Sequence, residues 1–375
     1  MIHNLINSKT TQTVDEWFHH IVNGGWHKYQ YAGIKAFLIG AIFAGSLVPA
    51  KIGRKLPSKT EPFYGMKRIY RLIDNPRITD DKMLAFYLKR LRDYTHKRKE
   101  IILAFDWTTL YKKFNLLSIS LVTHKGRTIP IAYAGYEIGA FSEFDSQNKI
   151  EENLLMQIIE VIPKKCRCIF IADRGFDRPE IPELFIEHKV KFVIRASIGT
   201  WIINDDYKFK LSMETIKKGE IKDFGKVTYS QTNPVELRLV SAWDKKMKEP
   251  WHLLTNLIYK DLQRILNIYS RRMEIEEMFK SKKNDQCGLN WKHARLETID
   301  RWLHLAFLTT ILFQFLFEIA FACGTSYKKL ENRYTLCRRE QRVFSMYYLA
   351  MLILSDYEAF LIELNMKGRI RLKYI

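Results

Sequence analysis

The sequence predicts an α/β protein in which a strand-rich core lies between two helical regions. Three observations lead to this prediction. Apolar residues recur at helical spacing near the N-terminus, short apolar and alternating runs typical of strands follow, and long apolar helices return towards the C-terminus. We therefore expect a helical region at 1–98, a mixed core at 99–300 interrupted by extra strands at 197–257, and a helical region at 301–375.

Composition and charge limit the class of protein. The 375 residues are 47% apolar and 13% aromatic, which is enough to bury a core without disulfides or structural metals. Lys and Arg number 61 against 41 Asp and Glu, so the net charge of +20 predicts a polyanionic partner, nucleic acid ahead of an acidic membrane surface. The five cysteines lack the spacing of a zinc site or a disulfide framework, which indicates a reducing compartment.

The N-terminal residues do not resemble a secretory signal, and we expect a cytoplasmic protein. Two apolar stretches, Ala32 to Ala50 and Trp302 to Cys323, are long enough to be tested as membrane spans. The second carries Thr310, Gln314 and Glu318 at intervals of four residues. Such a polar stripe favours a buried helix that faces a site, so we expect no membrane partner.

The N-terminal region is expected to bind DNA. Prolines and the Asn75-Pro76 pair separate amphipathic segments, and Thr79 precedes two acids as a helix cap. The predicted helices are Thr13–Val22, Tyr31–Val48, Glu61–Ile73 and Thr79–His96. A basic run in this region is either a solvated surface or a face that grips phosphates, and the net charge favours the second. The run consists of Lys51, Arg54, Lys55, Lys59, Lys67, Arg68 and Arg71.

From residue 100 the apolar period changes to that of strands. The core strands are predicted at Ile101–Asp106, Phe114–Val122, Arg127–Tyr136, Cys168–Ala172 and Phe192–Ala196, with helices at Lys149–Ile162 and Pro179–His188. Their order resembles a ribonuclease H-like domain, in which the first and fourth strands lie side by side. The predicted insertion has strands at Gly225–Ser230, Val235–Trp243 and Pro250–Thr255, and a last helix covers Phe344–Leu364.

Two acids end buried strands. Asp106 ends the first strand and Asp173 the fourth, so neighbouring parallel strands would bring both carboxylates to one edge of the sheet. A single acid after a strand is more often a turn former or a helix cap. Two such acids together with a helical Glu make a metal site the better interpretation.

A helix predicted from Tyr269 to Lys283 carries further candidate site residues. At about 100° per residue, Tyr269, Arg272, Glu276 and Lys283 fall on one arc roughly 60° wide, beside an apolar stripe that can seat the helix. An ordinary amphipathic helix with a solvated charged edge has the same pattern, and this stretch alone leaves both interpretations open.

The three acids suit phosphodiester chemistry. Two divalent ions roughly 4 Å apart can neutralise a pentacovalent phosphorus and activate an oxygen nucleophile, and ions of the Mg²⁺ kind prefer carboxylate oxygens. Asp106, Asp173 and Glu276 are therefore the candidate catalytic residues and metal ligands. We expect two Mg²⁺ ions, with Mn²⁺ able to replace them.

Cations next to the acids are the candidate DNA contacts. Arg272 suits a bidentate grip on a phosphate, Lys283 acts as a point charge, and Tyr269 can hydrogen-bond a phosphate or stack on a sugar. Lys280 and Arg174 complete this set.

The spacing Tyr269-x2-Arg272-x3-Glu276-x6-Lys283 resembles the YREK signature of the DDE transposases called the insertion-sequence-four family, which move DNA by cut and paste. The strand that ends in Asp106 and the DRGF run that begins at Asp173 add to the resemblance, which covers about residues 60–300. It implies that the three acids bind two Mg²⁺ ions and that the other YREK residues contact DNA near the cleaved end.

The resemblance also implies a DNA hairpin intermediate, with a flipped base stacked on a tryptophan of the β insertion. Trp251 occupies the similar position, and the alternative is an aromatic packed in the core of the insertion. Trp107, Trp201 and Trp243 are weaker candidates. The implied partners are double-stranded DNA, as terminal inverted repeats and target, and a second copy of the chain in a synaptic homodimer.

We interpret the sequence as that of a DNA transposase that acts by Mg-dependent hydrolysis and strand transfer. Two alternatives remain. One is a ribonuclease H-like nuclease without strand transfer, and the other is a DNA-binding protein derived from a transposase.

Overall fold

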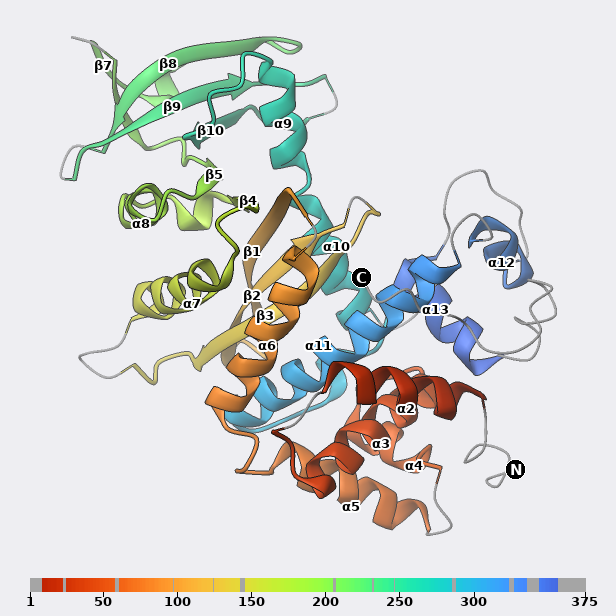
Figure 1. The fold of residues 1–375 in the computed structure, drawn as a ribbon. Coiled ribbons are helices and arrows are strands. Elements are labelled where there is room, and N and C mark those ends of the chain that lie inside the picture. Colours follow the sequence, from red (N-terminus) through yellow and green to blue (C-terminus); the bar gives the residue numbers. More distant parts are fainter. Residues whose placement is uncertain are drawn as a thin grey trace.

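The computed structural model describes residues 9–22, 25–57, 61–96, 98–123, 125–141, 146–204, 207–230, 233–245, 247–284, 288–323, 327–335 and 344–356. Within these residues a large mixed sheet runs through the molecule, with helices on both faces and a group of N-terminal helices at one end (Figure 1). This mixed α/β architecture is consistent with the predicted ribonuclease H-like core.

The described strands form one ten-stranded sheet in the order β3-β2-β1-β4-β5-β10-β9-β8-β6-β7. The strands are β1 (Glu100–Leu110), β2 (Phe114–Val122), β3 (Thr128–Glu137), β4 (Arg167–Ala172), β5 (Lys191–Arg195), β6 (Trp201–Asn204), β7 (Tyr207–Lys210), β8 (Ile221–Tyr229), β9 (Val235–Ala242) and β10 (Trp251–Thr255). β1 pairs antiparallel with β2 and parallel with β4. The predicted contact between the first and fourth strands of the core is therefore confirmed.

Strands β6 to β10 continue the core sheet instead of forming a sheet of their own. β10 pairs antiparallel with β5, and β9 and β8 follow outward from it. The sequence suggested a separate β subdomain in this stretch and missed β6 and β7, which are too short to show a period. The proposed boundaries at residues 98, 197, 257 and 300 stay predictions.

Among the described residues, five helices precede the sheet: α2 (Lys9–Ile21), α3 (Lys28–Ala44), α4 (Pro49–Arg54), α5 (Pro62–Ile73) and α6 (Asp80–Thr95). α3 ends earlier than predicted because Gly45 adopts a left-handed φ of 57°, and Pro49 then starts α4. Thr79 caps α6 as expected, accepting a hydrogen bond from the Lys82 amide at 3.4 Å. Between α4 and α5 a Cβ on Gly65 would lie 2.2 Å from the Gly53 carbonyl, so only glycine allows this close packing.

The remaining helices surround the sheet and fill the C-terminal region. They are α7 (Gln147–Val161), α8 (Glu180–Glu187), α9 (Leu262–Ser270), α10 (Met273–Lys283), α11 (Ile299–Ala322), α12 (Tyr327–Arg333) and α13 (Met346–Ser355), with one-turn 3₁₀ helices at Arg174–Phe176, Leu211–Met213 and Trp291–His293. The predicted helix Phe344–Leu364 corresponds to α13, and its last residues lie outside the described part of the chain.

Helix α11 is the central helix of the core. It is long and apolar enough to cross a membrane, but 89% of its most apolar window is buried within the protein. Its polar stripe does not face a site, which corrects the expectation from the sequence. Gln314 and Glu318 accept hydrogen bonds from Arg90 at 2.9 and 3.0 Å, and Glu318 also accepts one from the Trp17 indole at 2.7 Å. These buried polar groups hold α11, α6 and α2 together.

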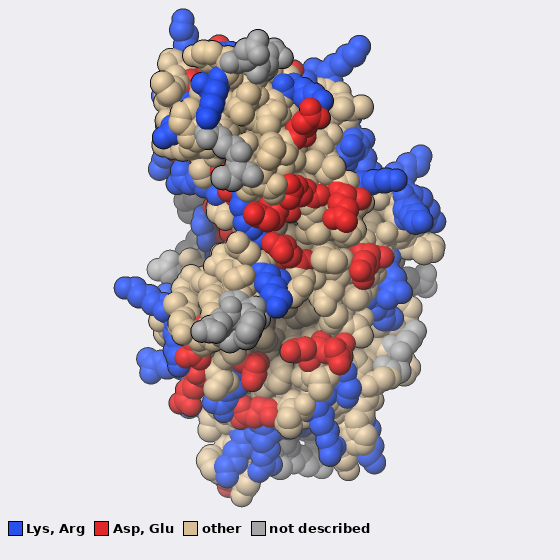
Figure 2. Space-filling view, turned by 90° about the vertical axis from the view of Figure 1, so that its left-hand side faces the viewer, with Lys and Arg blue, Asp and Glu red and all other residues tan. Residues whose placement is uncertain are grey.

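The side of the molecule that carries α7 and α8 is not uniformly basic despite the net charge of +20. Figure 2 shows acidic side chains gathered over the middle of this side, with Lys and Arg towards its ends. The net positive charge is therefore not spread evenly over this face of the protein.

Candidate active site

Asp106 lies inside β1, not at its end. The strand continues to Leu110, and Asp106 pairs with Ser118 of the neighbouring strand β2. The predicted strand boundary is therefore wrong, because Trp107 and Thr108 extend the antiparallel ladder with β2 although they are less apolar than the residues before them. Asp106 follows the fully buried Phe105 and precedes the partly buried Trp107, and its own side chain is 18% exposed.

Asp173 directly follows β4, as the sequence predicted. β1 and β4 pair in parallel up to Ala104 and Ile171, so continuing the register by two residues brings Asp106 and Asp173 opposite one another. One carboxylate oxygen of Asp173 accepts a hydrogen bond from the Gly175 amide at 2.8 Å and caps the short 3₁₀ helix Arg174–Phe176. The two acids thus lie at one edge of a parallel strand pair.

The helix predicted from Tyr269 to Lys283 is two helices. α9 ends at Ser270 and α10 begins at Met273, with Arg272 at the N-cap position between them. A single helical arc therefore does not hold all four candidates. Tyr269 belongs to α9, whereas Glu276 and Lys283 lie on α10.

Arg272 lies between two of the acids. Its Nη2 is 2.5 Å from Glu276 Oε1, and its Nη1 is 3.7 Å from Asp106 Oδ2. Its side chain is only 12% exposed, so this cation is held among the carboxylates rather than free on the surface. Arg272 therefore links the N-terminal end of α10 to the middle of β1.

The pKa of Asp106 reflects the other acids that lie near it. Burial, and next the negative charge of Asp173 with a smaller effect of Glu276, raise the pKa of Asp106 to about 7, while Arg272 opposes the shift. Three acids from β1, the end of β4 and α10 therefore influence one another. A divalent cation would reverse this penalty by favouring the ionised form.

Carboxylates are the ligands that a hard divalent ion prefers, but these side chains are not arranged as a complete metal site in the structure. In the ranges that the structure describes, no group of three or more acidic, histidine or cysteine side chains is placed to hold a metal ion. Glu276 is paired with Arg272, and the same guanidinium lies 3.7 Å from Asp106. Asp106 and Asp173 supply two suitable ligands, and Glu276 could add a third.

Lys283 lies over β1 at the other end of α10. Its Nζ donates to Thr108 Oγ1 at 2.5 Å and to the Thr109 carbonyl at 3.3 Å. Burial lowers the pKa of Lys283, and the charge of Asp106 opposes that shift.

Lys280 is exposed and bonds to Glu277, so it does not join the acids. Arg174 is 54% exposed and lies 4.0 Å from Glu249.

Tyr269 and Trp251 form an aromatic pair beside the acids. Their ring centroids are 4.8 Å apart at 78°, an edge-to-face contact between α9 and β10. Burial raises the pKa of Tyr269 to about 12, and the neighbouring Arg272 opposes this. Trp251 is half-buried, so it has both a packing partner and an accessible surface.

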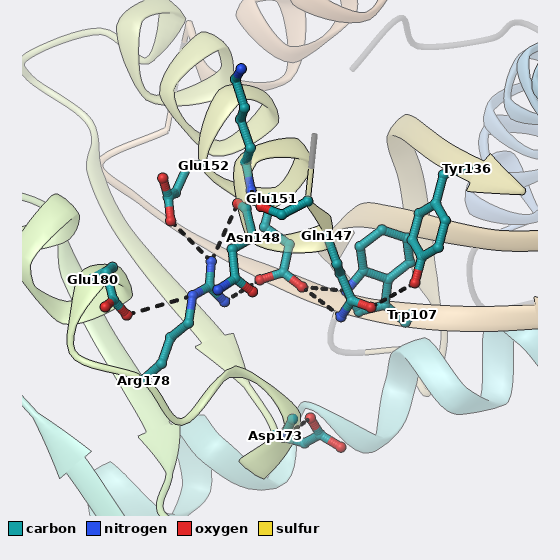
Figure 3. Close-up of polar contacts among 12 residues, drawn as sticks. Trp107, Tyr136, Gln147, Asn148, Glu151, Glu152, Asp173, Arg178 and Glu180 are labelled. Carbon is teal, nitrogen blue, oxygen red and sulfur yellow. Dashed lines mark hydrogen bonds and ion pairs between the residues drawn. The ribbon is translucent and has the colours of Figure 1, made fainter. Parts of the chain in front are cut away.

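Sequence reasoning missed the residues that support these acids. Glu151 on α7 is fully buried and contacts both Trp107 and Arg178, while Asp177 accepts hydrogen bonds from the segment after β5 and from Tyr229 of β8 (Figure 3 shows the Glu151 contacts). One signal was present. Glu151 shares the buried face of α7 with Leu155 and Ile158, and an acid on an apolar face needs a partner.

Comparison with protein families identifies the family of the chain. The family model described as Transposase DDE domain matches residues 97–312, which is more than half of the chain. No curated protein matches the sequence. The matched range contains Asp106, Asp173 and Glu276 together with the whole ten-stranded sheet. The chain therefore belongs to the DDE transposases, which are metal-dependent enzymes of DNA phosphoryl transfer.

Proposed function

We propose that this transposase carries out cut-and-paste transposition of an insertion sequence in the manner of the insertion-sequence-four family. The position of Arg272 between Asp106 and Glu276 carries the proposal. A guanidinium among the acids and Lys283 on the same helix can hold phosphates on both sides of the cleaved bond. A glycosidase would use a carboxylate pair without such cations.

In this proposal Asp106, Asp173 and Glu276 would hold two Mg²⁺ ions, which Mn²⁺ could replace. When bound, the ions neutralise phosphate charge and activate the attacking oxygen. Glu276 reaches the aspartate pair by releasing Arg272, and Arg272 then binds a phosphate of the DNA. The mutual electrostatic influence of the three acids supports their convergence on one site.

The proposed reaction is a series of displacements at phosphorus. Water hydrolyses one strand at the element's end and leaves a 3′-hydroxyl. This hydroxyl attacks the opposite strand, which forms a hairpin and releases the flanking DNA. A second water opens the hairpin. The 3′-hydroxyl then attacks a phosphodiester of the target DNA, which forms a new bond to its phosphorus and displaces the target's own 3′-hydroxyl. Trp251, packed on Tyr269, is the residue that we assign to the flipped base.

The proposed partners follow from the same reaction. The substrate is the terminal inverted repeats of the element and the target on chromosomal DNA in the cytoplasm. The basic N-terminal region would bind the repeats, and Lys280 and Arg174 would add peripheral phosphate contacts. Joining two ends to one target requires two active sites, so we propose a homodimer on DNA.

Cleavage of DNA that carries the inverted repeats flanking the gene tests the proposal. With Mg²⁺, Asp106→Ala, Asp173→Ala and Glu276→Ala are each expected to slow nicking by at least about 1,000-fold, because each removes a ligand of ions that stabilise transition-state charge. Glu236→Ala, on a side chain that is 68% exposed, is the control. An acid whose variant nicks at the native rate is not a ligand.

Pre-cut ends separate the remaining alternatives. Joined product with target DNA supports transposition. Nicking without any joined product would leave only a nuclease, and DNA binding without turnover in either Mg²⁺ or Mn²⁺ would leave only a DNA-binding protein derived from a transposase.

A further inference from the structure

The backbone pairing that aligns Asp106 with Asp173 stops before it reaches them. The last paired residues of β1 and β4 are Ala104 and Ile171. Beyond that point β4 ends and the chain turns into the 3₁₀ helix Arg174–Phe176. Ladder hydrogen bonds between β1 and β4 therefore end two residues before the acids, although β2 still pairs with Asp106 and β5 with Ala172. Side-chain contacts between the two segments can add to the control of the separation of the acids.

Glu151 of α7 connects the two segments beyond the end of the ladder. Its Oε1 accepts a hydrogen bond from the Trp107 indole at 2.6 Å, and its Oε2 is bonded to Nη1 of Arg178. Trp107 follows Asp106 directly, and Arg178 lies in the loop that begins at Asp173. Figure 3 shows Glu151 between these two partners, with Asp173 at the start of the segment that carries Arg178.

The connection is buried and specific. The side chain of Glu151 is 0% exposed and that of Arg178 is 15% exposed, so little water screens their attraction. Gln147 donates a further hydrogen bond to Glu151 Oε1 at 3.1 Å, and its own amide oxygen accepts one from Tyr136 at 2.7 Å. Charge-assisted bonds in such a setting have restricted geometry.

Glu151 acts from the face of the sheet opposite to the acids. Successive strand residues point to opposite faces, so Trp107 points towards α7 while Asp106 points towards Arg272 at the N-cap of α10. Glu151 therefore reaches the acids only through the segments it holds and does not touch the phosphate or the ions.

We propose that Glu151 is a positioning residue that fixes the spacing of Asp106 and Asp173 for divalent-ion binding, by tying Trp107 to Arg178. The inference rests on the proposed roles of these two acids. A buried ion pair can also serve only to stabilise a fold. The two cases differ in what a mutation changes, because positioning alters metal affinity in protein that is still folded.

Manganese binding to the full-length protein without DNA tests the proposal, with free Mn²⁺ measured by electron paramagnetic resonance. Glu151→Gln keeps an oxygen for Trp107 but places an amide where Arg178 needs a charge. Trp107→Phe keeps an aromatic ring and removes the N–H donor. Each is expected to weaken Mn²⁺ binding by about 10-fold or more, the range for groups that orient metal ligands, and to slow nicking in parallel. Glu160→Gln, an exposed residue of the same helix, is the matched control and is expected to bind normally.

The outcomes separate this inference from the proposed function. Native Mn²⁺ affinity in folded Glu151→Gln, with only a lower melting temperature, would overturn the positioning role. If Glu151→Gln does not fold, Trp107→Phe decides in the same way. Asp106→Ala is measured alongside. Native Mn²⁺ binding and nicking by Asp106→Ala would refute the proposed site itself, whereas loss in Asp106→Ala with native behaviour of the other two would refute only the role of Glu151.

Discussion

Arg272 and Glu276 form an ion pair of 2.5 Å across the first turn of α10. The same guanidinium lies 3.7 Å from Asp106, so one cation restrains an acid from its own helix and an acid from β1. Cations and metal ions compete for such carboxylates. The ion pair therefore holds the proposed ligands close together before ions bind, and its rearrangement is part of the proposed activation of the site.

The raised pKa of Asp106 makes the stability of the metal-free protein depend on pH. The folded-state pKa is about 7, against a usual value near 3.8, so between these values the folded state binds a proton that the unfolded state has lost. Stability contributed by protonated Asp106 is thus present at low pH and is lost as pH rises to about 7. Asp106→Asn, which cannot ionise, is expected to be more stable than the native protein at pH 8, by up to about 4 kcal/mol.

Urea denaturation in chelator at pH 4, 6 and 8 measures this effect. The advantage of Asp106→Asn grows with pH and levels off above pH 7. An advantage that is constant across this range would mean that Asp106 has an ordinary pKa.

Lys283 is expected to contribute one phosphate contact. Lys283→Ala would weaken binding to DNA ends and lower the slope of log K against log salt by about 1, because one fewer counterion is released. Fluorescence anisotropy between 50 and 200 mM salt, as a range suited to this slope, gives the measurement. Lys164→Ala, exposed near the opposite end of β4, serves as the control. An unchanged slope in Lys283→Ala removes this residue from the DNA contacts.

Trp251 is expected to act after the first cut. Its contact with Tyr269 contributes packing of about 1 kcal/mol, whereas stacking of a flipped base contributes roughly 1 to 3 kcal/mol. Trp251→Ala should therefore nick at close to the native rate and form hairpins about 5- to 100-fold more slowly. Trp251→Phe retains a stacking surface and is expected to recover most of the hairpin yield. Normal hairpin formation by Trp251→Ala shows that this tryptophan is structural.

Asp177 is expected to attach the outer strands to the loop after Asp173. Its Oδ2 accepts from the Ser197 amide and the Thr200 hydroxyl, both at 2.6 Å, and its Oδ1 accepts from Tyr229 at 2.7 Å. Asp177→Ala leaves these donors without an acceptor and should lower the free energy of unfolding by about 3 kcal/mol. Urea denaturation tests this, with Glu236→Ala as the exposed control. A loss below about 0.5 kcal/mol, typical of surface positions, contradicts it.

Sequence patterns located most of the regular elements of the core. β2 begins and ends where its apolar run does, and β4 and α7 lie within a few residues of their predicted bounds. The errors occur where tertiary pairing or a local break overrides the pattern. β1 runs past Asp106 because β2 pairs with it, and the helix at Tyr269 breaks before α10. The residues at 357–364 of the last predicted helix lie outside the described chain.

The features of the candidate site also divide into those that the sequence predicts and those that only the structure shows. The spacing of Tyr269, Arg272, Glu276 and Lys283 and the placement of Asp106 and Asp173 after apolar runs can be seen in the chain itself. The attachment of Glu151 to Trp107 and Arg178 cannot, apart from the signal of an acid on an apolar helix face.

By itself the sequence determined the types of element, the basic character and the six chemically suited residues, because period, charge and spacing are properties of neighbouring residues. Only the tertiary structure decided that Arg272 contacts Asp106, that the outer strands join the core sheet, and that Glu151 of α7 binds Trp107 and Arg178. Those contacts join residues far apart in the chain, and they follow from the packing of whole elements against one another, which local patterns do not encode.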